Sequence, residues 1–353
     1  SARRACSGGS DMLDNLDLSM RANHVFFALL TAILAVLGVM LAITGDTFYL
    51  RLATEALILG GLALSVDILL GFGGLLSLGQ ALYFGIGAYT SALVLREVPS
   101  FWGAMLAAIG VTLVCGIIGG LIANRVRGVY FALITFGMAQ VVAKVVYNTR
   151  SLGASDGLIG VPVLDIPLGF VTISAGSPLA FFVLTFVIIA LMYGGVAYLL
   201  STPFGRVIIA LKANEKRLPF LGYSTWKPRM AAYVIAALVA GISGALYPML
   251  RGFVSPELMF FATSGNALIM VIVGGVGTLV GALYGAALLT LLKSIIGSLT
   301  EHHLIVIGLI FIGAILFMPK GLIGVVKPAV QGRLTRRARE HAHLPLTARR
   351  EGD

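Results

Sequence analysis

Four ionisable side chains fall inside long apolar stretches of this chain: Glu55, Asp67, Lys144 and Lys293. A charge within a membrane-spanning segment costs free energy, so such residues indicate ion paths, proton relays or substrate contacts by default. Glu55 and Lys144 lie near the ends of their stretches, where a long side chain extends to the membrane surface. Asp67 is close to a predicted turn that water reaches, but one carboxylate without a matched partner does not make a proton pathway.

The side chains that serve catalysis or metal binding are not spaced for either chemistry. Glu301, His302 and His303 are adjacent, and neighbouring residues on a helix point in different directions, so we interpret them as polar residues at the membrane interface. The five histidines are terminal or at the edges of apolar stretches, which does not favour a Ser-His-Asp arrangement. The glycine run 274–281 lacks the lysine of a phosphate loop. The sequence therefore predicts no enzyme activity, no metal site and no cofactor in this chain.

Glycine is abundant inside the apolar stretches, and two runs, Gly71–Gln80 and Gly274–Gly281, interrupt them. Glycine lets a membrane helix break so that free backbone groups face a cavity, and paired interruptions of this kind indicate the path in many transporters. For any single glycine, the alternative is tight helix packing. The residues that we predict to line or gate a path are Ser77, Gly79, Gln80, Gly274, Gly275, Gly277 and Thr278.

A short basic segment, residues 205–222, lies between two long apolar stretches. About three helical turns are predicted to run to Arg217 before Pro219 ends the regular helix. The apolar residues of this helix form one stripe with the polar residues elsewhere around it; they are Val207, Ile208 and Leu211. An amphipathic helix of this kind either lies on the membrane surface or inserts into a groove on a partner protein, and its position between spans favours the partner.

These residues must be positioned by membrane helices, because 58% of the 353 residues are hydrophobic and only 11% are charged. A helix that crosses the hydrocarbon needs about 20 mainly apolar residues. The predicted fold is all-α and polytopic, with about ten spans (eight to ten) and glycine-broken helices. Segment 263–275 is short enough to be re-entrant, and the first apolar run lacks a clear cleavage site for a signal peptide. The predicted spans are 24–44, 50–70, 76–95, 101–123, 129–147, 179–200, 229–250, 263–275, 278–297 and 303–318.

The basic residues predict the orientation of these spans. Segment 205–229, the tail after Lys320 and the turn at 125–127 are all basic and fall on one face in the ten-span count, which the positive-inside rule makes cytoplasmic. We therefore expect a cytoplasmic tail at 1–23, a transmembrane domain at 24–324 with a cytoplasmic loop at 205–228, and a disordered basic tail at 325–353 with affinity for anionic lipid. The exported loop 148–178 carries Ser155, Asp156 and Gly157 as candidate contact residues.

Several segments in order along the chain resemble the LivM-like permease subunits of branched-chain amino acid ABC transporters. The similar segments begin at Gly74, Gly128, Gly153, Gly205, Ser255, Gly274 and Met318. The resemblance covers residues 25–324, and the combination is specific although each segment alone is weak.

The resemblance implies a subunit of an importer in a bacterial cytoplasmic (inner) membrane, driven by ATP and alternating access. It implies a heterodimer with a second homologous permease, two cytoplasmic ATPase subunits that hold ATP and Mg, and an extracytoplasmic binding protein that delivers leucine, isoleucine or valine. No nucleic acid is expected, and both termini would be cytoplasmic. The implied ATPase-coupling residues are Gly205, Arg206, Leu211, Lys212, Asn214, Glu215, Arg217 and Gly222.

The chain departs from the family pattern at three places: Asp67 stands where asparagine is usual, Leu218–Pro219 replaces a small and acidic pair, and Ala282 replaces a common proline. Urea or short amides, carried by related permeases, are the nearest alternative substrates. A secondary transporter or channel would use similar broken helices without needing the basic helix. We expect Glu215 and Arg217 to act in coupling rather than in folding, because both lie in a loop predicted to face solvent.

Overall fold

The computed structural model describes most of the chain from residue 47 to residue 323. The described residues are 47–162, 165–167, 172–174, 177–215, 218–299, 302–317 and 321–323. The predicted first span at 24–44, the predicted tails at 1–23 and 325–353, and Arg217 lie outside them.

Ten α-helices are found among the described residues. Their bounds are α2 Thr47–Asp67, α3 Gln80–Glu97, α4 Phe101–Ala123, α5 Val129–Asn148, α6 Pro178–Ser201, α7 Pro203–Asn214, α8 Trp226–Arg251, α9 Phe261–Gly274, α10 Val280–Leu299 and α11 His303–Phe317. A π-helical turn, η1 Ile68–Phe72, continues α2, and the short 3-10 helices are η2 Arg150–Leu152, η3 Ala154–Asp156, η4 Pro219–Leu221 and η5 Pro256–Met259.

Six of these helices are long and apolar enough to cross a membrane, within the residues that were described: α2 with η1, α4, α5, α6, α8 and α10. All six agree with predicted spans to within a few residues. The prediction of about ten spans is therefore supported in its type, while the number is not confirmed. The helix α9 has 14 residues, a length of about 21 Å, which is less than the roughly 30 Å of hydrocarbon.

The predicted span 76–95 begins later than expected. Residues 73–79 form a non-helical break, and α3 starts at Gln80. The sequence pattern did not exclude this, because Gly73, Gly74 and Gly79 are compatible with a broken as well as a helical backbone.

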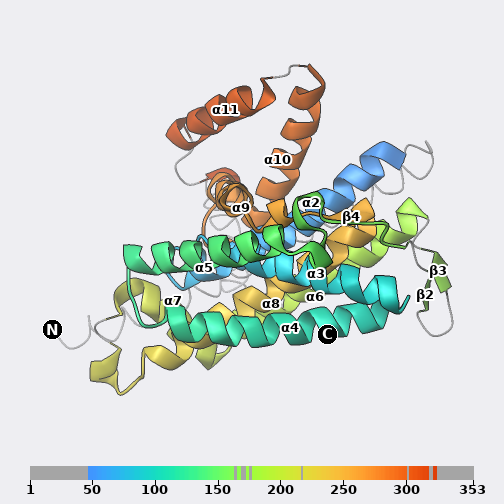
Figure 1. Ribbon diagram of the computed structural model, residues 1–353. Helices are drawn as coiled ribbons and strands as arrows, with labels where there is room; N and C mark the ends of the chain where they lie inside the picture. Colours follow the sequence, from blue (N-terminus) through green and yellow to red (C-terminus); the bar gives the residue numbers. More distant parts are fainter. Residues whose placement is uncertain are drawn as a thin grey trace, which may run out of the picture.

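The helices α3 and α8 lie side by side at the centre of the bundle (Figure 1). Small residues make their close contact possible, because a Cβ added at Gly87 of α3 would collide with the carbonyl oxygen of Gly241 on α8. The Ser91 hydroxyl donates a hydrogen bond of 2.8 Å to the carbonyl oxygen of Ala245 across the same interface. Close backbone approach at this interface is combined with large buried side chains, such as Tyr83 of α3 and Tyr233 of α8, whose hydroxyl groups lie 3.0 Å apart.

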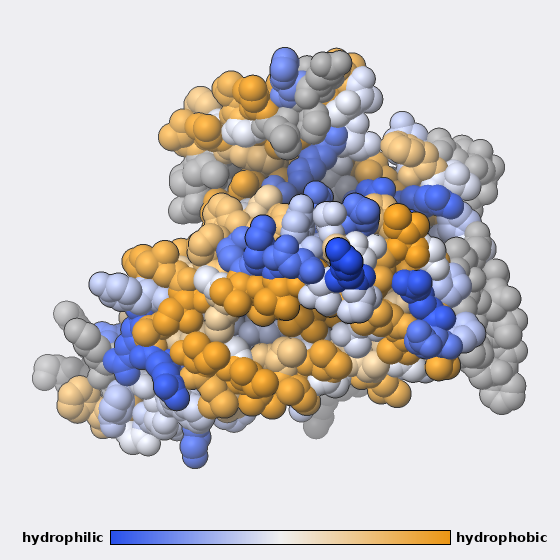
Figure 2. All heavy atoms as spheres, viewed as in Figure 1, coloured by the Kyte–Doolittle hydropathy of each residue, from blue (hydrophilic) through white to orange (hydrophobic). Residues whose placement is uncertain are grey.

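The outward faces of α4, α5 and α6 are apolar. In the view that contains α4 and α5, hydrophobic residues form a broad band across the lower middle, while hydrophilic residues lie at its two ends and in a smaller group above it (Figure 2). On α4, Leu106 and Val114 are 67% and 56% exposed. Such a band is expected of helices that face lipid or another membrane subunit.

Four short strands, which the all-α prediction did not include, pair in the loops. The strand β1 Leu158–Ile159 pairs antiparallel with β4 Phe253–Val254, and β2 Asp165–Pro167 pairs with β3 Thr172–Ser174. The β1–β4 pair joins the loop 148–178, which was predicted to be exported, to the segment that follows α8. The β2–β3 hairpin and α7 lie at opposite ends of the bundle (Figure 1).

Candidate coupling and gating site

The predicted basic helix forms α7 and folds back onto the end of α6. Its first turn is capped by Thr202, whose hydroxyl oxygen accepts a hydrogen bond of 3.3 Å from the Gly205 N–H. Gly205 is buried, and a Cβ there would collide with the carbonyl oxygen of Leu199. Of the predicted apolar stripe, Ile208 and Leu211 are buried and Val207 is partly buried. The helix ends at Asn214, earlier than predicted.

The polar side of α7 carries the predicted coupling residues. Arg206, Lys212 and Asn214 are exposed. Gly222 is also exposed and closes the turn after η4 with a φ of 78°. Large aromatic side chains that the sequence analysis did not single out stand exposed nearby: Phe204, Phe220, Tyr223 and Trp226.

Lys212 connects α7 to the first glycine-rich break. Its Nζ donates a hydrogen bond of 2.6 Å to the carbonyl oxygen of Gly71, in the π-helical turn that ends α2. Carbonyls at a helix end lack intrahelical donors, so this lysine satisfies one of them. A Cβ at Gly74, which has a φ of 66°, would lie 3.0 to 3.1 Å from three carbons of Lys212. The chain of the break therefore runs directly against α7.

Asp67 connects the first break to the second. Its Oδ1 accepts a hydrogen bond of 2.6 Å from the Gly277 N–H, and its Oδ2 accepts one of 2.9 Å from the Leu279 N–H. A Cβ at Gly71 would lie 2.6 Å from the Gly277 nitrogen and would collide with Asp67 Oδ1. The two glycine runs, about 200 residues apart in sequence, thus meet at one carboxylate.

Asp67 does not have the environment that the sequence suggested. The residue is fully buried, with 0% exposure, so the expectation that water reaches it was wrong. The reason is that the α9–α10 turn, which could not be placed against α2 from sequence, covers it.

The turn between α9 and α10 is held in an unusual conformation. Leu279 has a φ of 56°, a left-handed conformation that costs a non-glycine residue about 1–2 kcal/mol. The bond from its N–H to Asp67 helps to hold that conformation. The Thr278 hydroxyl donates to the carbonyl oxygen of Gly275 at 2.7 Å and accepts from the Gly281 N–H at 3.0 Å. These contacts make the second break a defined turn.

The predicted path residues Ser77 and Gln80 lie at the end of the first break that leads into α3. Ser77 and Gln80 are 3% and 0% exposed, so in this conformation they are packed inside the chain rather than open to a channel. The Leu78 N–H donates to the hydroxyl oxygen of Thr135 on α5 at 3.2 Å, and the Ala81 N–H donates to the hydroxyl oxygen of Ser264 on α9 at 3.2 Å. The end of the first break is therefore hydrogen-bonded to both α5 and α9.

Glu215, immediately after α7, is engaged in ion pairs within the chain. Its Oε1 lies 3.2 Å from Arg229 Nη1 and 3.3 Å from Arg127 Nε. Arg229 is 3% exposed and donates from Nη2 to the carbonyl oxygen of Val126 at 2.7 Å. The end of α7 is thus tied to the α4–α5 loop and to the start of α8. Sequence reasoning counted the two arginines only as topological charges, because ion pairs between distant segments leave no local pattern.

The predicted loop residues Ser155, Asp156 and Gly157 lie together in and after η3, at the β1 end of the bundle. The Ser155 hydroxyl donates to Asp156 Oδ1 at 3.1 Å, and both residues are exposed. Gly157 has a φ of 74°, and a Cβ there would collide with the carbonyl oxygen of Val254. This group and the α7 group are therefore two separate surfaces.

The other intramembrane charges have different surroundings. The sequence interpretation of Glu55 as a side chain extending to the surface was incomplete, because its carboxylate pairs with Arg251 at the end of α8. Lys144 is exposed, with Nζ 4.8 Å from the centre of the Tyr147 ring. Lys293 borders a cavity with Glu55 and Arg251. Within the described part of the chain, no group of three metal-ligating side chains is found.

Comparisons with known proteins give one family. The family model described as "Branched-chain amino acid transport system / permease component" matches residues 48–315. The high-affinity branched-chain amino acid transport system permease protein LivM of Escherichia coli is 27% identical over 349 residues, which cover 93% of this chain and 81% of that protein. LivM of Salmonella typhimurium is 27% identical over 301 residues, which cover 79% of this chain and 71% of that protein.

A second group of relatives is similar over a shorter part. The permease protein LivH of Escherichia coli is 28% identical over 129 residues, which cover 36% of this chain and 41% of LivH. No solved structure matches this chain. Because the family match extends over most of the chain, this protein belongs to the branched-chain amino acid transport permease family, as a LivM-like permease subunit with several membrane-spanning helices.

Proposed function

We propose that this permease subunit is one half of the membrane channel of an ATP-driven importer for leucine, isoleucine and valine. Its partners are a second, LivH-like permease, two ATPase subunits that hold ATP and Mg, and an extracytoplasmic binding protein. The similarity of this chain to both LivM and LivH proteins supports a pair of related permeases. In this proposal α7 and both chain termini face the cytoplasm of a bacterial cell, and the loop with Ser155, Asp156 and Gly157 faces the binding protein.

The observation that carries the proposal is the line of contacts from α7 to both broken helices. Lys212 holds the Gly71 carbonyl, Gly71 packs on Asp67, and Asp67 holds the backbone of Gly277 and Leu279. An element that lies at the end of the bundle, contacts the first interruption directly and reaches the second through Asp67 is well placed to move them together. A purely lipid-bound surface helix would not need these bonds.

Coupling follows from this arrangement as a rigid-body movement. The exposed residues of α7, with Arg206 and Asn214 among them, contact an ATPase subunit, and the aromatic side chains beside α7 provide apolar contact area. Closure of the ATPases displaces α7. Because Lys212 binds the end of α2 and Asp67 binds the α9–α10 turn, both breaks follow, and the pathway changes between outward and inward access.

The gate in this mechanism consists of the two breaks. Ser77, Gly79 and Gln80 in the first break, and Gly274, Gly275, Gly277 and Thr278 in the second, are buried or nearly so in the present conformation. The side-chain oxygen of Gln80 is buried without a hydrogen-bond partner among the described residues. A buried acceptor of this kind costs free energy, so a conformation that gives it a donor would be favoured. We therefore expect the gate to open at the first break when α7 moves.

The experiment that tests the proposal is reconstitution of the whole transporter. We would purify the tagged chain from its native membrane in mild detergent, identify the proteins that accompany it by mass spectrometry, and reconstitute the complex in proteoliposomes with the binding protein. Uptake of radiolabelled leucine, isoleucine, valine, urea and short amides would then be measured with and without ATP.

Recovery of a second permease and an ATPase, with ATP-dependent uptake of the three branched-chain amino acids, is the expected result. Preferential uptake of urea or a short amide would replace the proposed substrate but keep the importer. Transport by this chain alone without ATP would overturn the proposal in favour of a secondary transporter or channel.

A further inference from the structure

A cavity at the end of the bundle remote from α7 has the size of a small-molecule site. It lies between α2, α8 and α10 and has a volume of about 580 Å³, within the range of about 300–1,000 Å³ that is usual for such sites. Its walls combine charged and apolar side chains. The charged residues are Arg51, Glu55, Arg251 and Lys293, and the apolar ones include Leu52, Leu59 and Leu250.

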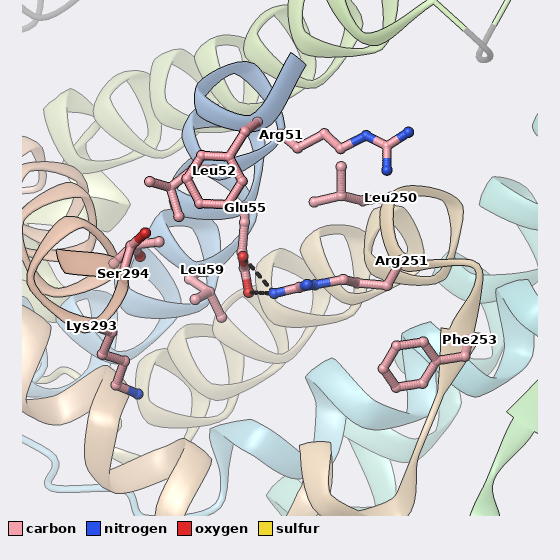
Figure 3. A pocket seen from close by; sticks show the side chains of 11 residues that line it. Arg51, Leu52, Glu55, Leu59, Leu250, Arg251, Phe253, Lys293 and Ser294 are labelled. Carbon is pink, nitrogen blue, oxygen red and sulfur yellow. Dashed lines mark hydrogen bonds and ion pairs between the residues drawn. The ribbon is translucent and has the colours of Figure 1, made fainter. Parts of the chain in front are cut away.

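The charges in the cavity are arranged around one carboxylate. Figure 3 shows Glu55 of α2 facing Arg251, and Lys293 entering from α10. Arg251 Nη2 donates to both oxygens of Glu55, at 2.6 and 2.7 Å. Among the described residues no hydrogen bond or salt bridge is found for Lys293. The cavity thus offers the Glu55 carboxylate as an acceptor for a cation. It also offers the Lys293 ammonium group as a donor that takes no part in the Glu55–Arg251 pair.

The hydroxyl group of Thr290 is a further polar group at this cavity. Thr290 lies one helical turn before Lys293 on α10, lines the cavity and is only 5% exposed. Its Oγ1 is buried and has no hydrogen-bond partner in the described part of the chain. Buried hydroxyl groups are normally paired, so this one would gain a partner if Thr290 turned its Oγ1 into the cavity toward a ligand or a water molecule.

We propose that this cavity binds the transported amino acid as a zwitterion. Lys293 and Thr290 bind the α-carboxylate, Glu55 binds the α-ammonium group, and the aliphatic side chain packs against Leu52, Leu59 and Leu250. The inference deepens the proposed function, on which it rests, by assigning it a binding site. Glu55 supplies an acceptor that an ammonium group uses and a simple anion does not, and a neutral amide such as urea would not need charges of both signs.

The position of the cavity connects it to the two breaks. Glu55 and Asp67 lie on the same helix, 12 residues or about 18 Å apart. The cavity is bounded by α2 and α10, and the Asp67 bonds join α2 to the turn that leads into α10 at their other ends. A ligand held between Glu55 and Lys293 would therefore bridge the same two helices that Asp67 joins.

The test is direct binding of tritiated leucine to the purified transporter in lipid nanodiscs, without the binding protein. Lys293→Met keeps the Glu55–Arg251 pair and should weaken leucine binding by about tenfold or more, because a charged hydrogen bond is lost. Lys144→Met removes an exposed lysine near the end of another helix and should bind leucine as the wild type does. As competitors, leucinol lacks the carboxylate, 4-methylpentanoate lacks the ammonium group and urea lacks both, so all three should compete far less well than leucine.

Several results would overturn the assignment. These are the absence of saturable leucine binding by the wild-type complex, unchanged binding by Lys293→Met, or equal competition by 4-methylpentanoate, which would mean that the cavity takes any anion. A Lys293→Met variant that binds leucine normally but loses affinity for the binding protein would make the cavity a docking surface instead. The proposed function is judged separately, because it fails only if the wild-type transporter does not import these amino acids.

Discussion

At the scale of single residues, Asp67 has a role that its chemistry explains. Its two carboxylate oxygens accept hydrogen bonds from two different backbone N–H groups, those of Gly277 and Leu279. Asparagine, which the family resemblance leads us to expect at this place, offers one oxygen and one amide group. In this chain an amide would present its own N–H donors to a backbone donor. The substitution is therefore not neutral in these surroundings.

We predict that Asp67→Asn lowers the free energy of unfolding by about 1–3 kcal/mol, because one buried N–H of the α9–α10 turn loses its acceptor. Thermal unfolding of the purified complex in detergent measures the effect. Glu97→Gln, at the exposed end of α3, is the matched control and should leave stability unchanged. Identical unfolding curves for Asp67→Asn and the wild type would mean that the turn does not need the second acceptor.

Within the same segment, we expect Glu215 to have a structural role and Arg206 to have a docking role. Glu215 holds the buried Arg229, so Glu215→Gln should destabilise the permease by about 1.5–3 kcal/mol. Arg206 is exposed on α7, so Arg206→Gln should leave thermal stability unchanged and weaken association with the ATPase subunits. Both quantities are measured on the purified variants, by thermal unfolding and by recovery of the ATPases. The reverse pattern would return Glu215 to the purely solvent-facing role that its sequence position suggested.

At the scale of elements, the sequence predicted which segments are helices better than how they meet. Apolar runs placed α4, α5, α6, α8 and α10 closely, because burial in a membrane requires long uninterrupted runs. The same runs contain no signal for the contact of Gly71 with Gly277, which depends on packing of segments about 200 residues apart. The glycine runs correctly marked the breaks. The residue at which α3 begins and the β1–β4 pair could not be predicted, since glycine permits several conformations and two-residue strands have no pattern.

The close approach of the two breaks gives a prediction for Gly71. An added methyl group would lie 2.6 Å from the Gly277 nitrogen, so Gly71→Ala must push α2 and the α9–α10 turn apart, at a cost of about 1–3 kcal/mol. We expect reduced thermal stability and reduced leucine uptake. Gly194→Ala in α6, where no heavy atom lies within 4 Å of an added Cβ, is the control and should retain both. Normal uptake by Gly71→Ala would show that the breaks do not need to touch.

At the scale of the whole molecule, the two ends of the bundle have different chemistry. One end carries α7 with its exposed basic and aromatic residues, and the other carries the short strands and the cavity with Glu55, Arg251 and Lys293. The helices α2 and α10 run between them and are joined through Asp67. In the proposed mechanism, movement of α7 would reach the breaks through two short hydrogen-bonded contacts, and the apolar outer faces of α4, α5 and α6 would remain for lipid and for the second permease.

The most direct test of this account is the number of ATP molecules hydrolysed per leucine imported by Lys212→Met. Methionine keeps the apolar stem of the side chain but removes the 2.6 Å bond to the Gly71 carbonyl. In proteoliposomes with the binding protein, we predict that ATP hydrolysis continues while leucine uptake falls by about tenfold or more. Lys227→Met, an exposed lysine outside these contacts, should keep the wild-type ratio. An unchanged ratio for Lys212→Met would contradict the account, because α7 would then move the breaks without its bond to them.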